Sequence, residues 1–423
     1  MYKQFIISIL TLVSFLAKAQ KYVNYDYIYQ DNIRSVKCNP SLDPTRLALI
    51  PLSGGELRLS FDDLDGELSN YRYTIQYCNS DWSLYDGSEL DYIEGFVDGL
   101  VTEYHFSVNT LTNYTHYDLE LPNESTKWTR SGNYLLHIFN NTDKTAVLTR
   151  QFMVFDNLVS VIGHRMSSAK VDKRDSHQEI DFDVQTKNLS IRNPKLEVKA
   201  TILQNGRWDK SLTGIRPTFE RAQMLIFDEQ DVITFPAERE FHYLFLTSLR
   251  AKNDRIDKIS RFDDGYDVTL KPEIPLLDKG YIFNKDANGQ YIIDNRDQLS
   301  SLGQSDWTGD YANTLFTLAK PSPYEEGDVY VCGRFSDYLP YSECKMEYDD
   351  NKHAYFALMP LKQGYYNYKY AILGKDKKKL LTSSIDGDWY ETENDYTILI
   401  YYHPIGTRYD QLIGVGNMNT LTF

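Results

Sequence analysis

The chain has 423 residues, enough for several domains, and is rich in aromatic residues, with 34 tyrosines and 20 phenylalanines. Aromatic side chains suit pleated sheets and long apolar stripes at helical spacing are scarce, so the composition favours an all-β protein. A formal net charge of -15 argues against a nucleic-acid-binding role, because phosphate binding depends on Lys and Arg.

The first residues have the pattern of a secretory signal peptide. Lys3 supplies a positive charge, Phe5 to Leu16 is a short apolar run, and Ala17-Lys18-Ala19 fits the A-x-A cleavage pattern. The apolar run is shorter than the roughly 20 residues that a membrane-spanning helix needs. We therefore expect residues 1–19 to be removed, which leaves an exported protein that begins at Gln20 and has no transmembrane segment of its own.

Residues 20–156 are predicted to form an immunoglobulin-like β-sandwich. Within YRYTIQYC, residues 71–78, aromatic and aliphatic residues alternate with polar ones, which places them on one face of a strand. Asn79 to Asp81 then favour a turn, and Trp82 is predicted to fold back into the core of this domain. The same alternation predicts further strands at 57–61, 117–121, 134–138 and 147–155.

A second β-rich domain is predicted over residues 157–322, after the boundary at Asp156. Alternating apolar residues indicate strands at 179–186, 196–202 and 241–246, and Asn288-Gly289 indicates the tight turn of a hairpin over 276–294. Part of that hairpin matches a calcium loop, but Asn295 stands where the loop needs Glu, so a plain turn is favoured. The polar stretch 297–319 is interpreted as a linker at the end of this domain.

A third sandwich is predicted over residues 323–423, with strands at 329–335, 354–360, 364–373 and 396–403. The order of these strands and the stretch Gly333 to Tyr338 resemble early-set sandwiches related to starch- and glycogen-binding modules. In those modules exposed aromatic residues stack on sugar rings. The resemblance therefore makes Tyr338 and Trp389 candidate contacts for a glycan or a partner.

Four cysteines, Cys38, Cys78, Cys332 and Cys344, lie in a chain expected to enter an oxidising compartment, where disulfides persist. They allow three sets of pairings, and free buried thiols are an equal alternative. Cys332 and Cys344 flank one short connection. The sequence contains no CxxC motif and no Cys/His cluster, so we predict no metal site.

Motifs for enzyme chemistry are also missing from the sequence. It contains no GxSxG, no HExxH and no Gly-rich phosphate loop, and its eight histidines are scattered. We therefore predict no catalytic residues and no cofactor.

Several short runs in the predicted first domain are distinctive: CNSDW at 78–82, YIEGF at 92–96, YTHY at 114–117 and SGNY at 131–134. These sequence motifs resemble those of the first domain of the type IX secretion system plug proteins, and weaker similarity continues through the later domains. The residues that mark the resemblance are structural: Cys78, Asn79, Asp81, Trp82, Gly95, Phe96, Tyr114, Tyr117, Gly132 and Tyr134.

Members of that family are periplasmic proteins of the Bacteroidota that close the periplasmic mouth of a giant outer-membrane β-barrel translocon. The resemblance implies a periplasmic plug without enzymatic activity, associated with the inner side of the outer membrane and partnered by that barrel. The alternative function is a glycan-binding accessory protein that uses the early-set-like module.

Overall fold

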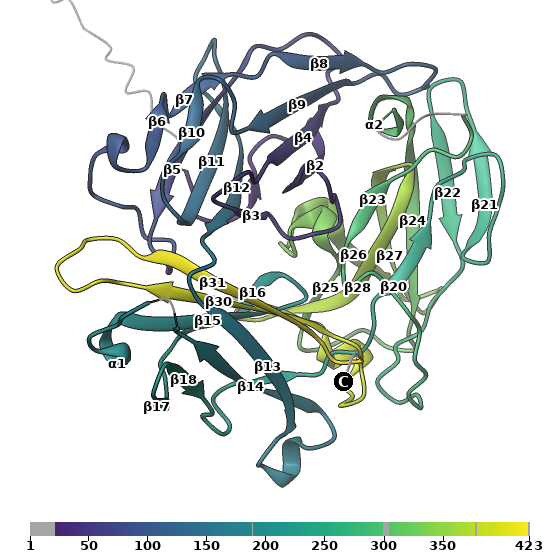
Figure 1. The fold of residues 1–423 in the computed structure, drawn as a ribbon. Helices are drawn as coiled ribbons and strands as arrows, with labels where there is room; N and C mark the ends of the chain where they lie inside the picture. Colours follow the sequence, from purple (N-terminus) through teal and green to yellow (C-terminus); the bar gives the residue numbers. More distant parts are fainter. Residues whose placement is uncertain (1–21, 188, 299–303, 377–378, 422–423) are drawn as a thin grey trace, which may run out of the picture.

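The computed structural model describes residues 22–187, 189–298, 304–376 and 379–421. The expected signal peptide, residues 1–19, lies outside this part of the chain. The described residues fold into three β-rich units that meet around a common centre, like the corners of a triangle (Figure 1). In this part of the chain helices are limited to single turns, and the predicted all-β class is confirmed.

The first domain, residues 22–156, is a sandwich of two sheets. Its first sheet has the order β1 (Tyr27–Ile28), β12 (Ala146–Phe155), β11 (Gly132–Asn140), β5 (Tyr71–Cys78) and β7 (Asp98–Leu100), with β3 (Leu49–Pro51) parallel to β12. Its second sheet has the order β2 (Ile33–Pro40), β4 (Leu57–Asp63), β9 (Thr115–Leu121) and β8 (Glu103–Phe106). A small ribbon joins β6 (Ile93–Gly95) to β10 (Thr126–Trp128).

The alternation in β5 builds the core of this domain. Tyr71, Tyr73 and Tyr77 are all buried on the face that looks toward the second sheet. Phe61 of β4 stacks on Tyr117 of β9 with ring centroids 5.2 Å apart, and both rings contact Tyr71 edge to face. Large aromatic rings therefore fill the space between the two sheets, which is why the predicted strands of this domain form where expected.

The second domain combines two distant parts of the chain, residues 157–237 and 394–421. One sheet has the order β13 (Ser160–Ser167), β14 (His177–Gln185), β18 (Met224–Phe227) and β17 (Phe219–Arg221), and β19 (Thr234–Pro236) also pairs with β14. The other has the order β16 (Arg207–Ile215), β15 (Val198–Gln204), β30 (Asp395–Tyr402) and β31 (Gln411–Asn419). Gly414 and Gly416 let β31 approach β13, since a Cβ atom there would meet Val159 or Val161 at less than 3 Å.

The third domain, residues 238–393, is inserted between β19 and β30. Its strands follow the order β20 (His242–Phe245), β28 (Gly364–Gly374), β25 (Gly327–Cys332), β26 (Lys345–Asp349), β27 (Ala354–Lys362), β24 (Tyr311–Ala319), β22 (Tyr266–Leu270) and β21 (Ile256–Arg261). Two short strands, β23 (Tyr291–Ile293) and β29 (Leu380–Leu381), also pair with β28. One apolar cluster runs through this unit.

These pairings correct the extents expected for the second and third domains, 157–322 and 323–423. Strand β24 lies between β27 and β22, so residues 311–319 are a strand of the third domain and not a linker. The C-terminal strands β30 and β31 complete the second domain, with Val198 in register with Tyr402. Local periodicity finds strands but does not say which distant strand completes a sheet, which explains the difference.

Candidate interaction surfaces

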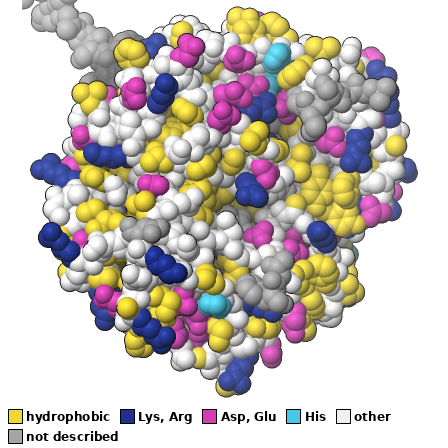
Figure 2. Space-filling view, viewed as in Figure 1, with side chains coloured by type: hydrophobic (Ala, Val, Ile, Leu, Met, Phe, Trp, Pro, Cys, Tyr) yellow, Lys and Arg dark blue, Asp and Glu magenta, His cyan; other side chains and the backbone are white. Residues whose placement is uncertain are grey.

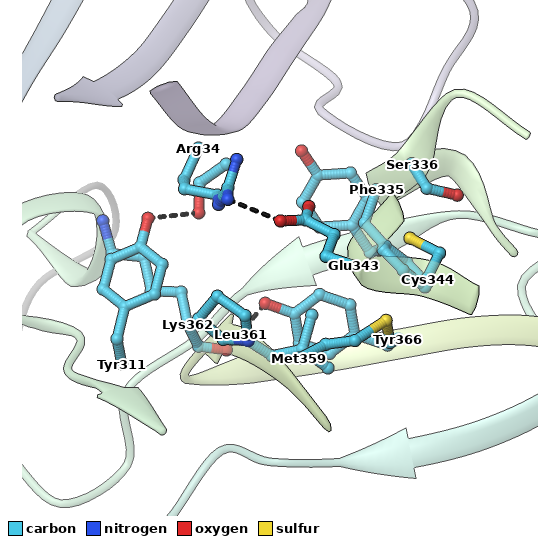
Figure 3. A pocket seen from close by; sticks show the side chains of 13 residues that line it. Arg34, Tyr311, Phe335, Ser336, Glu343, Cys344, Met359, Leu361, Lys362 and Tyr366 are labelled. Carbon is cyan, nitrogen blue, oxygen red and sulfur yellow. Dashed lines mark hydrogen bonds and ion pairs between the residues drawn. The ribbon is translucent and has the colours of Figure 1, made fainter. Parts of the chain in front are cut away.

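A small cavity lies where the first domain meets the third (Figure 3). Its volume is about 40 Å³, which has room for water but is far below the roughly 300 Å³ of a small ligand pocket. Inside it, Arg34 of β2 forms an ion pair with Glu343, and the Ser35 hydroxyl lies 2.7 Å from the Tyr311 hydroxyl. These two contacts cross the junction, so the cavity is part of the joint between two domains.

A buried network of charges also crosses this junction, centred on Asp62 at the end of β4. Its carboxylate accepts a hydrogen bond of 2.6 Å from the Tyr311 hydroxyl and lies 2.6 Å from Nδ1 of His116. It also forms an ion pair with Lys362 of β27. Asp62, His116 and Lys362 are each at most 3% exposed. Separating the two domains would remove the partner of a buried charge, which is costly, so the network favours one fixed arrangement.

The charge of His116 depends on two carboxylates. Burial alone would lower its pKa, but Asp118, 3.3 Å from Nε2, and Asp62 together outweigh burial and raise the pKa of His116 to about 9. Burial favours the neutral form of Asp62, yet the Lys362 ammonium and His116 hold the pKa of Asp62 below its usual value. Both groups are therefore charged at neutral pH. Arg58 completes the network by bridging Asp118 at 2.6 Å and Asp306 at 2.9 Å.

The junction between the first and second domains is mainly apolar. Trp82 is 6% exposed and packs against Trp208 of β16. Both belong to a cluster with residues of β15, β30 and β31, which is separate from the core of the first domain. The prediction that Trp82 is buried is therefore correct, but its ring fills a junction between domains and not the first core. Trp82 has a φ of 65°, the left-handed conformation that turns the chain at the end of β5.

Polar contacts fix the orientation of the same junction. Asp410, from the loop before β31, accepts a hydrogen bond of 2.9 Å from the backbone N–H of Ser80 and forms an ion pair of 2.8 Å with Lys199. The Tyr401 hydroxyl of β30 donates a hydrogen bond of 2.8 Å to Asn133 of β11. The C-terminal strands thus hold the first domain as well as completing the second.

The second and third domains share both chain connections and a set of side-chain contacts. The guanidinium group of Arg207 lies 3.9 Å from the centroid of the Tyr338 ring, and Asn288 donates a hydrogen bond of 2.7 Å to Asp395. Arg207 is 2% exposed and also pairs with Asp209. Every pair of domains is therefore joined by buried contacts, so the three units form one closed body.

The residues that mark the family resemblance lie in several parts of the first domain. Tyr117 and Tyr134 belong to its core, whereas Cys78 and Trp82 belong to the junction with the second domain. The Tyr114 hydroxyl donates a hydrogen bond of 2.7 Å to the carbonyl of Gly309 in the third domain. These residues are spread through the structure and do not form one pocket.

The other residues that carry the family resemblance lie in or beside loops. Asp81 accepts the backbone N–H of Ser83 at 3.0 Å, and Asn79 accepts the N–H of Trp82 at 2.9 Å through its carbonyl. Gly132 sits against Tyr77, where a Cβ atom would come within 2.3 Å of the ring hydroxyl, and Gly95 has a positive φ of 97°. Phe96 is 69% exposed. It is the one mark with a large free apolar surface.

The two candidate glycan contacts do not form a sugar site together. Tyr338 is 6% exposed and its ring is covered by Arg207 and Phe241, so it has no free face for a sugar ring. This corrects the expectation for Tyr338. Trp389 is 38% exposed, but it stacks on Tyr281 with centroids 5.5 Å apart and planes 6° apart. Trp389 thus offers a partial aromatic surface without the expected second residue.

All four cysteines are buried and free in this structure, so none of the pairings that the sequence allowed is formed. Burial raises the pKa of the Cys38 and Cys78 thiols to about 12 and that of Cys332 to about 11. Burial also raises the pKa of Cys344. These thiols are therefore protonated and shielded at neutral pH, which is the behaviour of structural cysteines.

Among the described residues, no group of three or more His, Cys, Asp and Glu side chains is placed to hold a metal ion. In the stretch that resembles a calcium loop, Asp286 instead accepts the backbone N–H of Asn288 at 2.7 Å and that of Phe241. None of the described helices is long and apolar enough to cross a membrane.

Sequence reasoning did not single out Asp62, His116, Lys362 or Arg207 as important. The sequence signal was weak, because each is an individual titratable residue within a strand. The importance of Asp62 and Lys362 comes from their mutual ion pair, although they lie far apart in the chain, and that of Arg207 comes from its contact with Tyr338 of the third domain.

The fold and its junctions define a multidomain β-sandwich protein whose buried contacts join its domains. Residues 33–156 match the family model described as the type 9 secretion system plug protein 1st domain, so the resemblance in the first domain is confirmed and this domain belongs to that family. The chain is also similar to a solved structure of a hypothetical protein from Parabacteroides merdae. That similarity has a TM-score of 0.88 and 27% identity, and it covers 93% of this chain and 99% of the other. No curated protein matches the chain.

Proposed function

We propose that this protein binds and closes the periplasmic opening of the type IX outer-membrane translocon, and that it does so without enzymatic activity. The match of residues 33–156 to the plug-protein first domain carries this proposal. The same match supports a location in the periplasm at the inner side of the outer membrane.

The architecture supports the proposal. A body that blocks a wide pore must keep its shape, because relative motion of its domains would open gaps. Here each pair of domains is joined by buried contacts, represented by Asp62 with Lys362, Trp82 with Trp208, and Arg207 with Tyr338. The third domain is also tethered to the second at both of its ends. Such a closed arrangement resists domain rotation better than a string of domains with single linkers.

The surface suits a broad protein interface. In Figure 2 hydrophobic side chains gather in several clusters with acidic and basic side chains between them. A stable seal would bury about 1,200 Å² or more in total. With a formal charge of -15, and two fewer lysines after cleavage at Ala19, the protein would be attracted to a basic rim around the pore. Association should therefore weaken as the salt concentration rises.

The deciding experiment measures outer-membrane permeability in four strains, with and without this protein and with and without the translocon barrel. We expect increased uptake of a large antibiotic, normally excluded by the outer membrane, only in the strain that has the barrel but lacks this protein. Equal uptake with and without the protein, while the barrel is present and otherwise unoccupied, would contradict the proposal.

A binding measurement separates this proposal from the glycan-binding alternative. Affinity purification of the protein from detergent-solubilised outer membrane should recover the giant barrel. Retention on a polysaccharide column that is lost with Trp389→Ala, without recovery of the barrel, would favour the alternative instead. The burial of Tyr338 weakens that alternative, since a stacking site commonly uses more than one aromatic ring.

A further inference from the structure

Strand β8 is an uncovered edge of the first domain. It is the last strand of the sheet β2-β4-β9-β8, and all four of its residues, Glu103–Phe106, are exposed. In Figure 1 it runs along the outer rim of the molecule. One of its residues, His105, stacks on Trp307 of α2 (Ser305–Thr308) in the third domain, with ring centroids 4.0 Å apart, so β8 borders the junction with that domain on one face. The strand contains no Lys or Pro, and its pairing with β9 has no bulge, so it lacks three common devices that protect sheet edges.

The register of β8 shows which backbone groups point outward. The N–H of Ser107 donates to the carbonyl of Tyr114 at 2.9 Å, in continuation of the pairs Phe106 with Thr115 and Tyr104 with Tyr117. In an antiparallel pair, bonded and non-bonded residues alternate. Tyr104 and Phe106 therefore direct their N–H and C=O groups away from β9. No other described part of the chain bonds to these four groups.

The side chains of the same two residues form an apolar shelf. The rings of Tyr104 and Phe106 contact each other edge to face at 5.6 Å and are 40% and 51% exposed. Leu68, 57% exposed, belongs to the loop after β4. Hydrogen bonds hold the neighbours of Leu68 in this loop to Thr115 and Tyr117, the residues of β9 that pair with Phe106 and Tyr104. Figure 2 shows hydrophobic side chains along the top of the molecule, where Figure 1 places β8. We call Leu68, Tyr104 and Phe106 the β8 shelf.

The opposite face of β8 carries Glu103 and His105, and the His105 ring is occupied by its stack on Trp307. Glu103 is in register with Asp118, and like charges opposite each other are unfavourable. Asp118 is already paired with Arg58, whereas no ion pair is formed by Glu103 among the described residues. Asp65 and Glu67, both exposed, add negative charge on the loop beside the shelf. A cation opposite Glu103 would relieve this repulsion.

We propose that the edge of β8 binds an extended segment of another protein as an added antiparallel strand. Residues of that segment opposite Tyr104 and Phe106 would exchange backbone hydrogen bonds with them and place apolar side chains on the β8 shelf. The alternate residues would point to the other face, where Glu103 selects Lys or Arg. The partner is thus a strand of alternating apolar and basic residues, and strand addition of this kind is a known mode of peptide recognition. The net charge of -15 opposes a second copy as the occupant. This site does not depend on the translocon proposal.

The test uses the mature protein and fluorescein-labelled octapeptides, with binding followed by fluorescence anisotropy. The probe alternates Val and Lys, and its control alternates Val and Glu. Two further probes carry N-methyl groups on the backbone, one on the Val residues and one on the Lys residues. Because the Val residues face the edge of β8, methylation of Val should abolish binding, and methylation of Lys should leave it intact. All four peptide measurements use the unmodified protein, so a folding defect of a variant cannot affect their result.

A pair of charge variants locates the site. Glu103→Lys should weaken binding of the Val-Lys peptide about fivefold, as expected for an exposed ion pair, and improve binding of the Val-Glu peptide. Glu124→Lys changes the net charge equally, on the exposed loop after β9, and should change binding less than about twofold.

Three results would overturn the proposal: no binding of the Val-Lys peptide, equal binding of the two methylated peptides, or equal effects of the two charge variants. A dimer in solution that the Val-Lys peptide dissociates would also overturn it, because the occupant would then be a second copy of the chain.

Discussion

Trp82 and Trp208 meet edge to face across the junction of the first and second domains, with ring centroids 5.0 Å apart and planes at 84°. Trp82 lies in the turn after β5 of the first domain and Trp208 lies on β16 of the second, and both belong to the same junction cluster. Because edge-to-face pairs add to the energy of burial, this contact couples the stability of one domain to the presence of the other.

Trp82→Ala should lower the free energy of unfolding by about 3 to 5 kcal/mol, the usual cost of removing a buried large aromatic side chain. Since the ring lies in a junction, the loss should appear together with easier separation of the first two domains, measured as faster proteolysis between Phe155 and Ser160. A double-mutant cycle with Trp208→Ala should show a coupling energy of about 1 kcal/mol. A change below about 0.5 kcal/mol in the single variant would mean that the ring does not stabilise the junction.

Lys362→Met should destabilise the protein by about 3 to 5 kcal/mol, because it leaves the Asp62 carboxylate buried without its cation. The double variant Asp62→Asn, Lys362→Met should recover part of the loss, since it removes the unpaired charge. Urea denaturation measures both. Lys352→Met is a matched control on an exposed turn and should cost less than about 0.5 kcal/mol. A double variant as unstable as the single one would show that packing around Lys362 matters more than charge.

The alternation of apolar and polar residues predicted most strands of the first domain and their place in it. For the other two domains it predicted strands but not which strands belong to which domain. The alternation at 71–78 is enough to place β5, because its buried residues face the neighbouring sheet of the same domain. In contrast, the sequence predicts a strand at 396–403 within the third domain, whereas the observed strand β30 pairs with β15 of the second domain, about 200 positions earlier in the chain. Sequence period shows which face of a strand is buried but not what covers it.

The same reason explains the errors at candidate sites. Tyr338 has the sequence context of an exposed sugar contact, but Phe241 and, from another domain, Arg207 cover its ring. The sequence indicates that Trp82 is buried but not which domain covers it, so Trp82 is predicted to lie in the core of its own domain. Asp62 looks like an ordinary polar residue, since its partners Lys362 and Tyr311 come from the third domain. His116 gains its role by pairing with Asp62 and Asp118, which lie on the neighbouring strand and on its own strand.

The cysteines give a prediction about redox state. Alkylation of the protein without reductant should modify none of the thiols in the native state, because all four are buried and burial raises their pKa values. After denaturation, mass spectrometry should find four alkylated cysteines. Fewer than four, again without reductant, would show that a disulfide forms in the exported protein and would identify Cys332 with Cys344 or another of the pairings that the sequence allows.

The final prediction concerns pH and rests on His116. Its pKa of about 9 in the folded protein is above the ordinary value of 6.5, so the native state holds a proton that the unfolded chain releases between these values. The stabilisation from this proton is complete below about pH 6.5 and is lost as pH rises through about 9. His116→Gln removes the effect. The stability advantage of the wild type over this variant should therefore shrink, by about 2 to 4 kcal/mol, between about pH 6 and about pH 10.

The measurement is urea denaturation of both proteins at several pH values, followed by tryptophan fluorescence. Comparison with the variant is essential because other groups also titrate, and Lys37, whose pKa burial lowers to about 8, acts in the opposite direction over part of this range. His164→Gln, at an exposed position on β13, is the matched control and should follow the wild type at every pH. If the difference between wild type and His116→Gln stays constant across the range, His116 is not charged in the folded protein. The junction between the first and third domains would then depend on Lys362 alone to neutralise Asp62.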